Sequence, residues 1–195
     1  MLKVYVTDDS LRESASNLDD VTLFSELSKV LNICLTSTNF KLREDKKLIP
    51  EKMKLTSRLA NINSPWMVWA RKSIGNYNWV INYANYLLLE YEKRKGATEL
   101  IKYYRNVLAS AMKIDAGEFI KGIRMTPMPN TTTNFKFIAD VYEAYRKELI
   151  VIWAGKLKSG KQVIWTNNSV PDWFAETEFF KSVCTVLEDL EVVDG

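Results

Sequence analysis

Aromatic, asparagine and basic side chains recur at helical spacing between residues 64 and 95. Aromatic rings can stack on bases, amide side chains can read the edges of bases, and guanidinium groups can hold phosphates. The stretch therefore predicts a partly open cleft on a helix that binds DNA or a nucleotide. The candidate contact residues, two of them from a later segment, are Trp66, Trp69, Arg71, Asn76, Tyr77, Trp79, Tyr83, Arg94, Tyr145 and Arg146.

A second interpretation of the same helix places its rings in the protein core and its asparagines in water. Asn78, Asn82 and Asn85 lie on the stripe next to the aromatic one. Asparagine is a poor residue for the interior of a helix. Something other than helix propensity must therefore keep three of them there, and the sequence leaves both interpretations open.

Glu90 is the candidate catalytic carboxylate. It follows three leucines and lies one helical turn before Arg94. Burial and a neighbouring charge are the means by which proteins prepare a carboxylate for acid-base work or for stabilising a sugar cation. The alternative is an ordinary ion pair between residues four apart on a helix. Arg146 is equally ambiguous, because it can hold a phosphate or anchor Asp140 or Glu143.

The composition excludes several kinds of site. The chain contains no histidine, which removes the usual zinc ligand, the usual general base and every Ser-His or Cys-His pair. Cys34 and Cys184 lie far apart in apolar helical patterns, which is typical of reduced, buried thiols. Any chemistry must use carboxylates, amines, hydroxyls or a metal held by oxygen atoms. We expect no cofactor and assign no metal ligand.

Charge and hydropathy limit the partners. A net charge of +3, from 27 basic and 24 acidic residues, excludes a uniformly basic surface, so a nucleic-acid site must be a local patch. No window is apolar enough to cross a bilayer. The N-terminus lacks the features of a signal peptide. We expect a protein of the cytoplasm with no membrane partner.

The elements that must position these residues are predicted to be mainly helical. With 195 residues, of which 47% are hydrophobic, the chain fits one compact domain, residues 1–195, folded as a helical bundle. Residues 3–6 predict a short N-terminal strand. A first long helix should begin near Asn17 and place these residues on one side: Leu18, Val21, Phe24, Leu27, Leu31 and Leu35.

Further boundaries follow from capping residues. Ser64 with Pro65 predicts a helix start, Gly75 divides the aromatic segment, Gly96 ends it, and Thr98 caps the next helix.

The remaining segments are predicted from composition and periodicity. Residues of about 39–63 and 115–134 should form irregular loops. Residues 135–153 should form a helix, although part of this segment could instead make a small hairpin around residues 158–161. A C-terminal helix is expected over about 172–191.

Several sequence pieces, spread over roughly residues 15–174, resemble one known family. They are LDD at the start of the first helix, SPWMVWARKSIGNYNWV, LLLEYEKRKG, TPMP, AYRK and PDWF. The family consists of small tailed-phage proteins that are sometimes labelled pyrimidine-dimer DNA glycosylases of the endonuclease V type. The resemblance implies a role in phage DNA metabolism and, for an enzyme, cleavage of N-glycosidic bonds or another modification of bases.

The chain departs from that family in two places. The relatives carry histidines just before WARKS and just after EYEKR, where this chain has RLANINSP and KGATEL. The resemblance is therefore to a divergent member. The bulky Leu2 favours retention of Met1, so an N-terminal amine nucleophile is not expected.

Two functions follow from these observations. The first is a phage-type protein that binds DNA or a nucleotide through the aromatic and basic helix and cleaves or modifies bases if it is an enzyme. The second is a non-enzymatic phage protein that binds and modulates a host protein of defence or transcription.

Overall fold

The computed structural model describes residues 2–44, 62–112 and 122–182. These residues form helices and no β-strand, so the predicted mainly helical fold is confirmed. The helices are α1 (Leu11–Ser16), α2 (Asp20–Glu44), α3 (Pro65–Ala70), α4 (Ile74–Lys95), α5 (Glu99–Met112), α6 (Val141–Lys158) and α7 (Asp172–Ala175).

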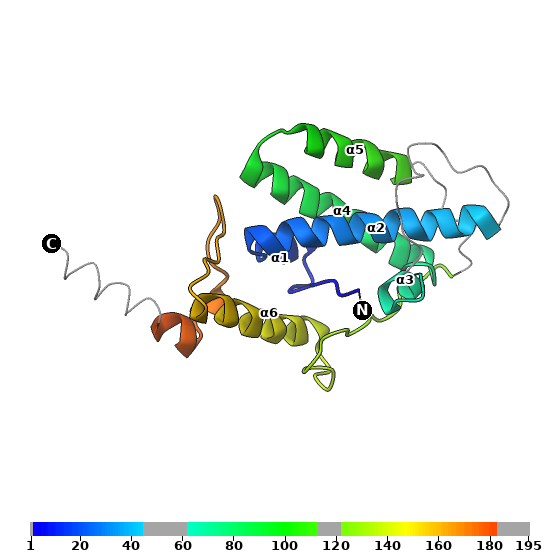
Figure 1. Cartoon of the computed structure of the whole chain (residues 1–195). Helices are drawn as coiled ribbons and strands as arrows, with labels where there is room; N and C mark the ends of the chain where they lie inside the picture. Colours follow the sequence, from blue (N-terminus) through cyan, green and yellow to red (C-terminus); the bar gives the residue numbers. More distant parts are fainter. Residues whose placement is uncertain (1, 45–61, 113–121, 183–195) are drawn as a thin grey trace.

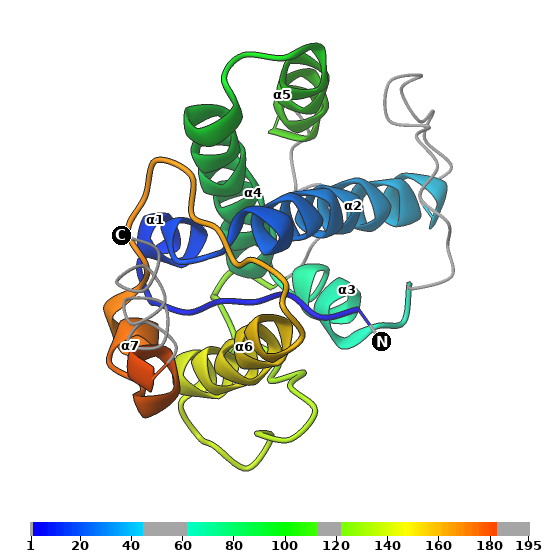
Figure 2. The ribbon, with the colours of Figure 1, turned by 60° about the vertical axis from the view of Figure 1, so that its left-hand side comes forward.

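The helices surround one hydrophobic core. Helices α2, α4 and α5 pack against one another, and the short α1 lies against α4. Helix α6 lies across the N-terminal segment from α2, as both ribbon views show (Figure 1 and Figure 2). The largest buried side chains of the core include Trp66, Tyr77, Tyr83, Tyr145, Trp153 and Phe174.

Three helix boundaries follow the capping signals in the sequence. Ser64 Oγ accepts a backbone hydrogen bond from the first turn of α3, and Pro65 is the first residue of that helix. Gly96 ends α4 with a φ of 72°, which glycine adopts without steric cost. Thr98 Oγ1 accepts a backbone hydrogen bond at the start of α5. These predictions are confirmed.

The break between α3 and α4 lies before Gly75 and not at it. Helix α4 begins at Ile74, and Ser73 is its N-cap. A Cβ on Gly75 would stand 2.6 Å from the backbone nitrogen of Met125. The absence of a side chain therefore lets the segment after residue 121 lie against the first turn of α4.

The predicted N-terminal strand is an extended segment that pairs with no other strand. Val4, Tyr5 and Val6 are buried, and a buried backbone must find hydrogen-bond partners. Side chains provide them, because the Tyr5 N–H donates to Glu26 Oε2 (3.0 Å) and the Tyr83 hydroxyl donates to the Tyr5 carbonyl (2.6 Å). The prediction of extended backbone was right and the prediction of a strand was wrong.

Two further helices bind the backbone of the same segment at Thr7. Ser14 Oγ, on α1, accepts a hydrogen bond from the Thr7 N–H (3.1 Å). The Nε of Arg146, on α6, donates to the Thr7 carbonyl (2.5 Å). Side chains from α1, α2, α4 and α6 therefore converge on residues 5–7.

The alternative of a small hairpin after residue 148 is excluded, because that stretch belongs to the continuous helix α6. The helix begins later than predicted, at Val141, where the Asp140 carboxylate caps two N–H groups of the first turn. Leu149 and Trp153 are buried one turn apart. The chain then returns in an extended form and places the ring of Trp165 5.0 Å from that of Trp153.

Two residues predicted for the inner side of the first helix lie at the surface. Val21 is 67% exposed and Phe24 is 41% exposed. Leu27, Leu31 and Leu35 are buried as predicted, and Leu23 and Val30 face the core in place of the two exposed residues. The inner side of α2 is therefore rotated from the predicted one.

The predicted loops are only partly described. Helix α2 continues to Glu44, so the loop expected over 39–63 begins later, and residues 45–61 lie outside the described ranges. Residues 122–134 are irregular as predicted, whereas 113–121 lie outside the described ranges.

The predicted C-terminal helix over 172–191 is interrupted. Helix α7 ends at Ala175, a second helical stretch occupies residues 178–182, and the rest of the predicted helix lies outside the described ranges. Helix α1 was not predicted. Within the described ranges, every helix is too short or too polar to traverse a lipid bilayer.

Glu26 makes a testable contribution to the pH dependence of stability. Burial raises the pKa of Glu26 to about 7, while Lys29 and the Tyr5 amide act in the opposite direction. The unfolded chain ionises this carboxyl near its ordinary pKa of 4.5. The folded state therefore binds more protons between these values, and stability must fall as pH rises through them.

We expect the free energy of unfolding to fall by about 2 to 3 kcal/mol between about pH 5 and pH 8 because of Glu26. The chain has no histidine that would titrate in this window. Urea unfolding of the Glu26→Gln variant should consequently show a much flatter pH dependence than the wild type. An equal dependence in both proteins would contradict this account.

Candidate functional site

Most of the aromatic rings predicted to contact nucleic acid are buried in the hydrophobic core. Trp66, Trp69, Tyr77 and Tyr83 on α3 and α4 are buried, and so is Tyr145 on α6. Their faces pack against other rings; for example, the Trp66 and Trp69 centroids are 5.4 Å apart. A base has no access to these faces, so the expectation that they form an open stacking surface is wrong.

Trp79 is the half-buried member of the same cluster. Its ring stacks on Trp66 at 5.9 Å and lies 5.5 Å from Trp69. It also tilts against Tyr83 at 5.2 Å. Trp79 therefore serves mainly as the outer cover of the aromatic core.

The polar atoms of these residues are also used internally. Trp66 Nε1 donates to Thr131 Oγ1 (3.3 Å), and Trp69 Nε1 donates to the Thr126 carbonyl (3.1 Å). Asn76, the predicted reader of a base edge, is fully buried: its Nδ2 donates to the Trp69 carbonyl and its Oδ1 accepts from the Thr126 N–H. The Tyr145 hydroxyl bonds residues 129 and 131. These groups hold the 122–134 segment onto the helices.

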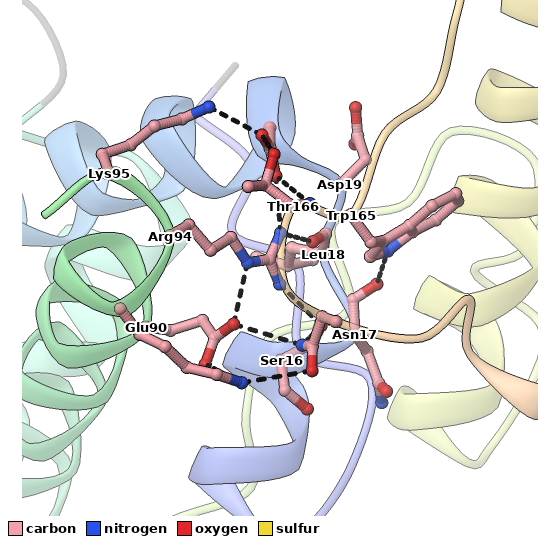
Figure 3. Close-up of polar contacts among 12 residues, drawn as sticks. Ser16, Asn17, Leu18, Asp19, Glu90, Arg94, Lys95, Trp165 and Thr166 are labelled. Carbon is pink, nitrogen blue, oxygen red and sulfur yellow. Dashed lines mark hydrogen bonds and ion pairs between the residues drawn. The ribbon is translucent and has the colours of Figure 1, made fainter.

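Arg94 is a structural hub (Figure 3). Its guanidinium is fully buried and donates to the carbonyls of Ser16 (2.8 Å) and Leu18 (2.7 Å). It also donates to Asp20 Oδ1 (3.0 Å) and Glu90 Oε1 (2.8 Å). The side chain thus fixes the end of α1 and the start of α2 to α4. None of its N–H groups is directed to solvent.

Asp20 extends this hub to the loop after α6. Desolvation would raise the pKa of Asp20, but hydrogen bonds from Lys95, Thr166 and Arg94 hold the pKa well below its usual range. The Thr166 hydroxyl donates to Asp20 Oδ2 at 2.6 Å. Asp20 lies in the first turn of α2, and it also connects that helix to α4 and to the loop after α6.

Glu90 combines a structural role with a place on the surface. Its Oε1 accepts from Arg94 Nε, as Figure 3 shows, and from Asn168 Nδ2 (3.1 Å). Its Oε2 lies 3.8 Å from Lys93 Nζ. The carboxylate also lines a concavity between α1 and α4. The ion-pair interpretation of Glu90 with Arg94 is therefore the one that the geometry supports.

The other two predicted arginines anchor the backbone. Arg146 donates to the Thr7 carbonyl and pairs with Asp8 Oδ2 at 3.1 Å, so its partner is neither of the two acids considered from the sequence. Arg71 Nη2 donates to the Ile62 carbonyl (3.0 Å). Both are partly exposed.

The asparagine side of α4 differs from its aromatic side. Asn78 and Asn82 are exposed and Asn85 is half-buried. The side chains of these three asparagines make no hydrogen bond or ion pair with the part of the chain that the structure describes. The same is true of the side chains of Tyr86 on α4 and Arg12 on α1. Their donors and acceptors are therefore available to a ligand.

These residues line a continuous series of concavities, which we call the asparagine groove. One concavity, of about 460 Å³, lies between α1 and α4, and another, of about 270 Å³, lies between α4 and α5; Asn82 belongs to both. A third, of about 390 Å³, shares Arg12 and Tyr86 with the first and continues to Lys93 and Asn168. The groove therefore follows α4 from Asn78 to Lys93.

Sequence reasoning found the asparagines and missed Arg12 and Tyr86. Asn78, Asn82, Tyr86 and Lys93 recur at intervals of four and seven residues, so the helical stripe was visible in the sequence. Arg12 carried no such signal, because α1 reaches α4 only through tertiary contacts. In the described ranges, no three cysteine or acidic side chains are grouped to hold a metal.

Comparisons with protein-family models, with curated proteins and with solved structures find no match to this chain. The functional argument therefore rests on the groove itself.

The structural role of Arg94 is testable. Arg94→Gln leaves Asp20 and Glu90 without their shared buried cation, so we expect a loss of about 3 to 5 kcal/mol in the free energy of unfolding. The matched control is Arg105→Gln, which removes an exposed ion pair with Glu92 and should cost no more than about 1 kcal/mol. Chemical denaturation of both variants measures the difference. Near-equal losses would show that Arg94 is not a hub.

Proposed function

We propose that this chain binds nucleic acid or a nucleotide through the asparagine groove. The observation that carries the proposal is the contrast between the two sides of α4. On the aromatic side, the rings other than half-buried Trp79 are buried, and the polar groups of Trp66, Trp69, Asn76 and Tyr83 are hydrogen-bonded inside the protein. The asparagine side presents unpartnered amides in a series of concavities.

The chemistry of the groove fits this class of ligand. Each carboxamide offers two donors and an acceptor, which is the combination that pairs with the edge of a base. The Tyr86 ring lies partly buried against the core and lines two of the concavities, where it can support a base. Arg12 of α1 is exposed beside the same concavities and can bind a phosphate.

The asparagines themselves support a functional origin. Three of them in one helix reduce its stability relative to alanine, and their side chains form no compensating hydrogen bond within the described part of the chain. Residues that lower stability without an internal contact are expected where binding requires them.

Catalysis is a weaker part of the proposal. The resemblance to the phage family implies cleavage of N-glycosidic bonds. Glu90 and Glu13 are the two carboxylates that line the groove. One oxygen of Glu90 already receives two hydrogen bonds. Binding is therefore the function that the geometry supports best, and cleavage stays a prediction.

Replacement of the asparagines tests the proposal. The triple variant Asn78→Ala, Asn82→Ala, Asn85→Ala should be more stable than the wild type by about 1 to 2 kcal/mol, because alanine is the better helix former. Its affinity for nucleic acid or nucleotide should fall at least tenfold, since each lost hydrogen bond contributes about 0.5 to 1.5 kcal/mol.

The matched control for this variant is Asn106→Ala, at an exposed position of α5 outside the groove. Thermal denaturation and fluorescence anisotropy measure stability and affinity. A destabilised triple variant would assign the asparagines a structural role, and unchanged binding would remove the groove from the site.

A second candidate function, binding of a host protein, is favoured by one observation. Val21 and Phe24 form an exposed apolar surface on α2, and the Phe24 ring lies 5.5 Å from the ring of Tyr91. Exposed apolar clusters mark protein-binding surfaces.

This candidate predicts that a host protein captured by the wild type is lost with Phe24→Asp. Phe137→Asp, at an isolated position that is 82% exposed, should still capture it. Identical capture by both variants would contradict a binding role for the α2 surface.

A further inference from the structure

The shape of the asparagine groove restricts the form of nucleic acid that it can accept. Asn82 lies between Ser10, Leu11 and Arg12 on one side and Ala111 and Met112 on the other. Helix α4 therefore lies between α1 and α5, and Figure 2 shows these two helices on different sides of it. A helix that reads duplex DNA must protrude far enough to enter the major groove. Here α1 and α5 flank the asparagine side of α4, so α4 cannot enter a major groove that has room for a single helix.

The charge of the groove points in the same direction. At its Lys93 end, two cations, Arg12 and Lys93, face two carboxylates, Glu13 and Glu90. Lys93 is already engaged by Glu90 and by Asn168 Oδ1 (3.3 Å). Duplex binding depends on many cations that neutralise closely spaced phosphates. A charge-balanced groove provides little of this attraction.

From these features, and on the basis of the proposed function, we infer that the ligand is a short single-stranded nucleic acid recognised mainly through its bases. A single strand can turn its base edges toward a row of amides, whereas in a duplex the pairing edges are occupied. The carboxamides of Asn78, Asn82 and Asn85 bind those edges. The Tyr86 ring supports a base, and Arg12 holds a backbone phosphate.

The length of the groove sets the size of the ligand. Fifteen residues of helix separate Asn78 from Lys93, which corresponds to about 22 Å. Bases stacked at about 3.4 Å would place on the order of six nucleotides in this length. A mononucleotide would occupy only one of the three concavities.

The test compares three probes by fluorescence anisotropy or competition: a mixed-sequence single strand of about 12 nucleotides, the duplex that it forms with its complement, and free mononucleotides. We expect the single strand to bind at least tenfold more tightly than either of the others. With Arg12 as the phosphate contact, the slope of log K against log salt should be near about −0.7.

Two variants separate the contribution of the carboxamides from that of the Arg12 guanidinium. Asn82→Ala with Asn85→Ala should weaken single-strand binding at least fivefold and leave the salt slope unchanged. Arg12→Ala should reduce the magnitude of the slope by about 0.7. Asn106→Ala, outside the groove, should change neither quantity.

The possible failures are distinguishable. Equal or tighter binding of the duplex, a slope steeper than about −4, or equal binding of a mononucleotide would overturn the single-strand inference while the proposed function stands. Single-strand binding that the groove variants leave unchanged would overturn both proposals, because each of them places the ligand in the groove. Absence of binding to all three probes would overturn both proposals.

Discussion

The fold depends on hydrogen bonds that side chains make to the buried backbone of residues 5–7. This segment lies between the α2–α4 layer and α6 (Figure 1), where an unpaired amide or carbonyl would be costly. Glu26 accepts from the Tyr5 amide, Tyr83 donates to the Tyr5 carbonyl, and Arg146 donates to the Thr7 carbonyl. Helices that are distant in sequence are thus fixed to one another through a strand-like segment that belongs to no sheet.

This arrangement explains why α4 has two sides with different roles. Tyr83 and Arg94 face inward, where Tyr83 bonds the N-terminal segment and Arg94 bonds the end of α1 and the start of α2. The aromatic side is therefore committed to the fold. The side chains of Asn78, Asn82 and Asn85 have no hydrogen-bond partner among the described residues, and α1, whose position Arg94 fixes, lies beside them.

The sequence predicted helix boundaries well, but it predicted less well which side of each helix is buried. Caps such as Ser64 and Thr98 act within one turn, so their residues and spacing suffice to predict them. Burial of Trp66 and Trp69 depends on Thr131 and Thr126, which lie more than fifty residues away in the chain, and no local pattern contains that information. The prediction of a strand at residues 3–6 failed for the same reason, because its backbone partners are side chains of α2 and α4. The asparagine stripe was detectable because its residues contradict helix propensity.

The central claim is that a ligand contacts the asparagine side of α4 and leaves the aromatic side in place. Titration of a ¹⁵N-labelled sample with a short DNA single strand, followed through side-chain NMR signals, tests it most directly. The account predicts shifts of the Asn78, Asn82 and Asn85 amide signals, with the Trp66 and Trp69 indole signals unchanged. Shifts of those indole signals with unchanged asparagine amides would contradict it.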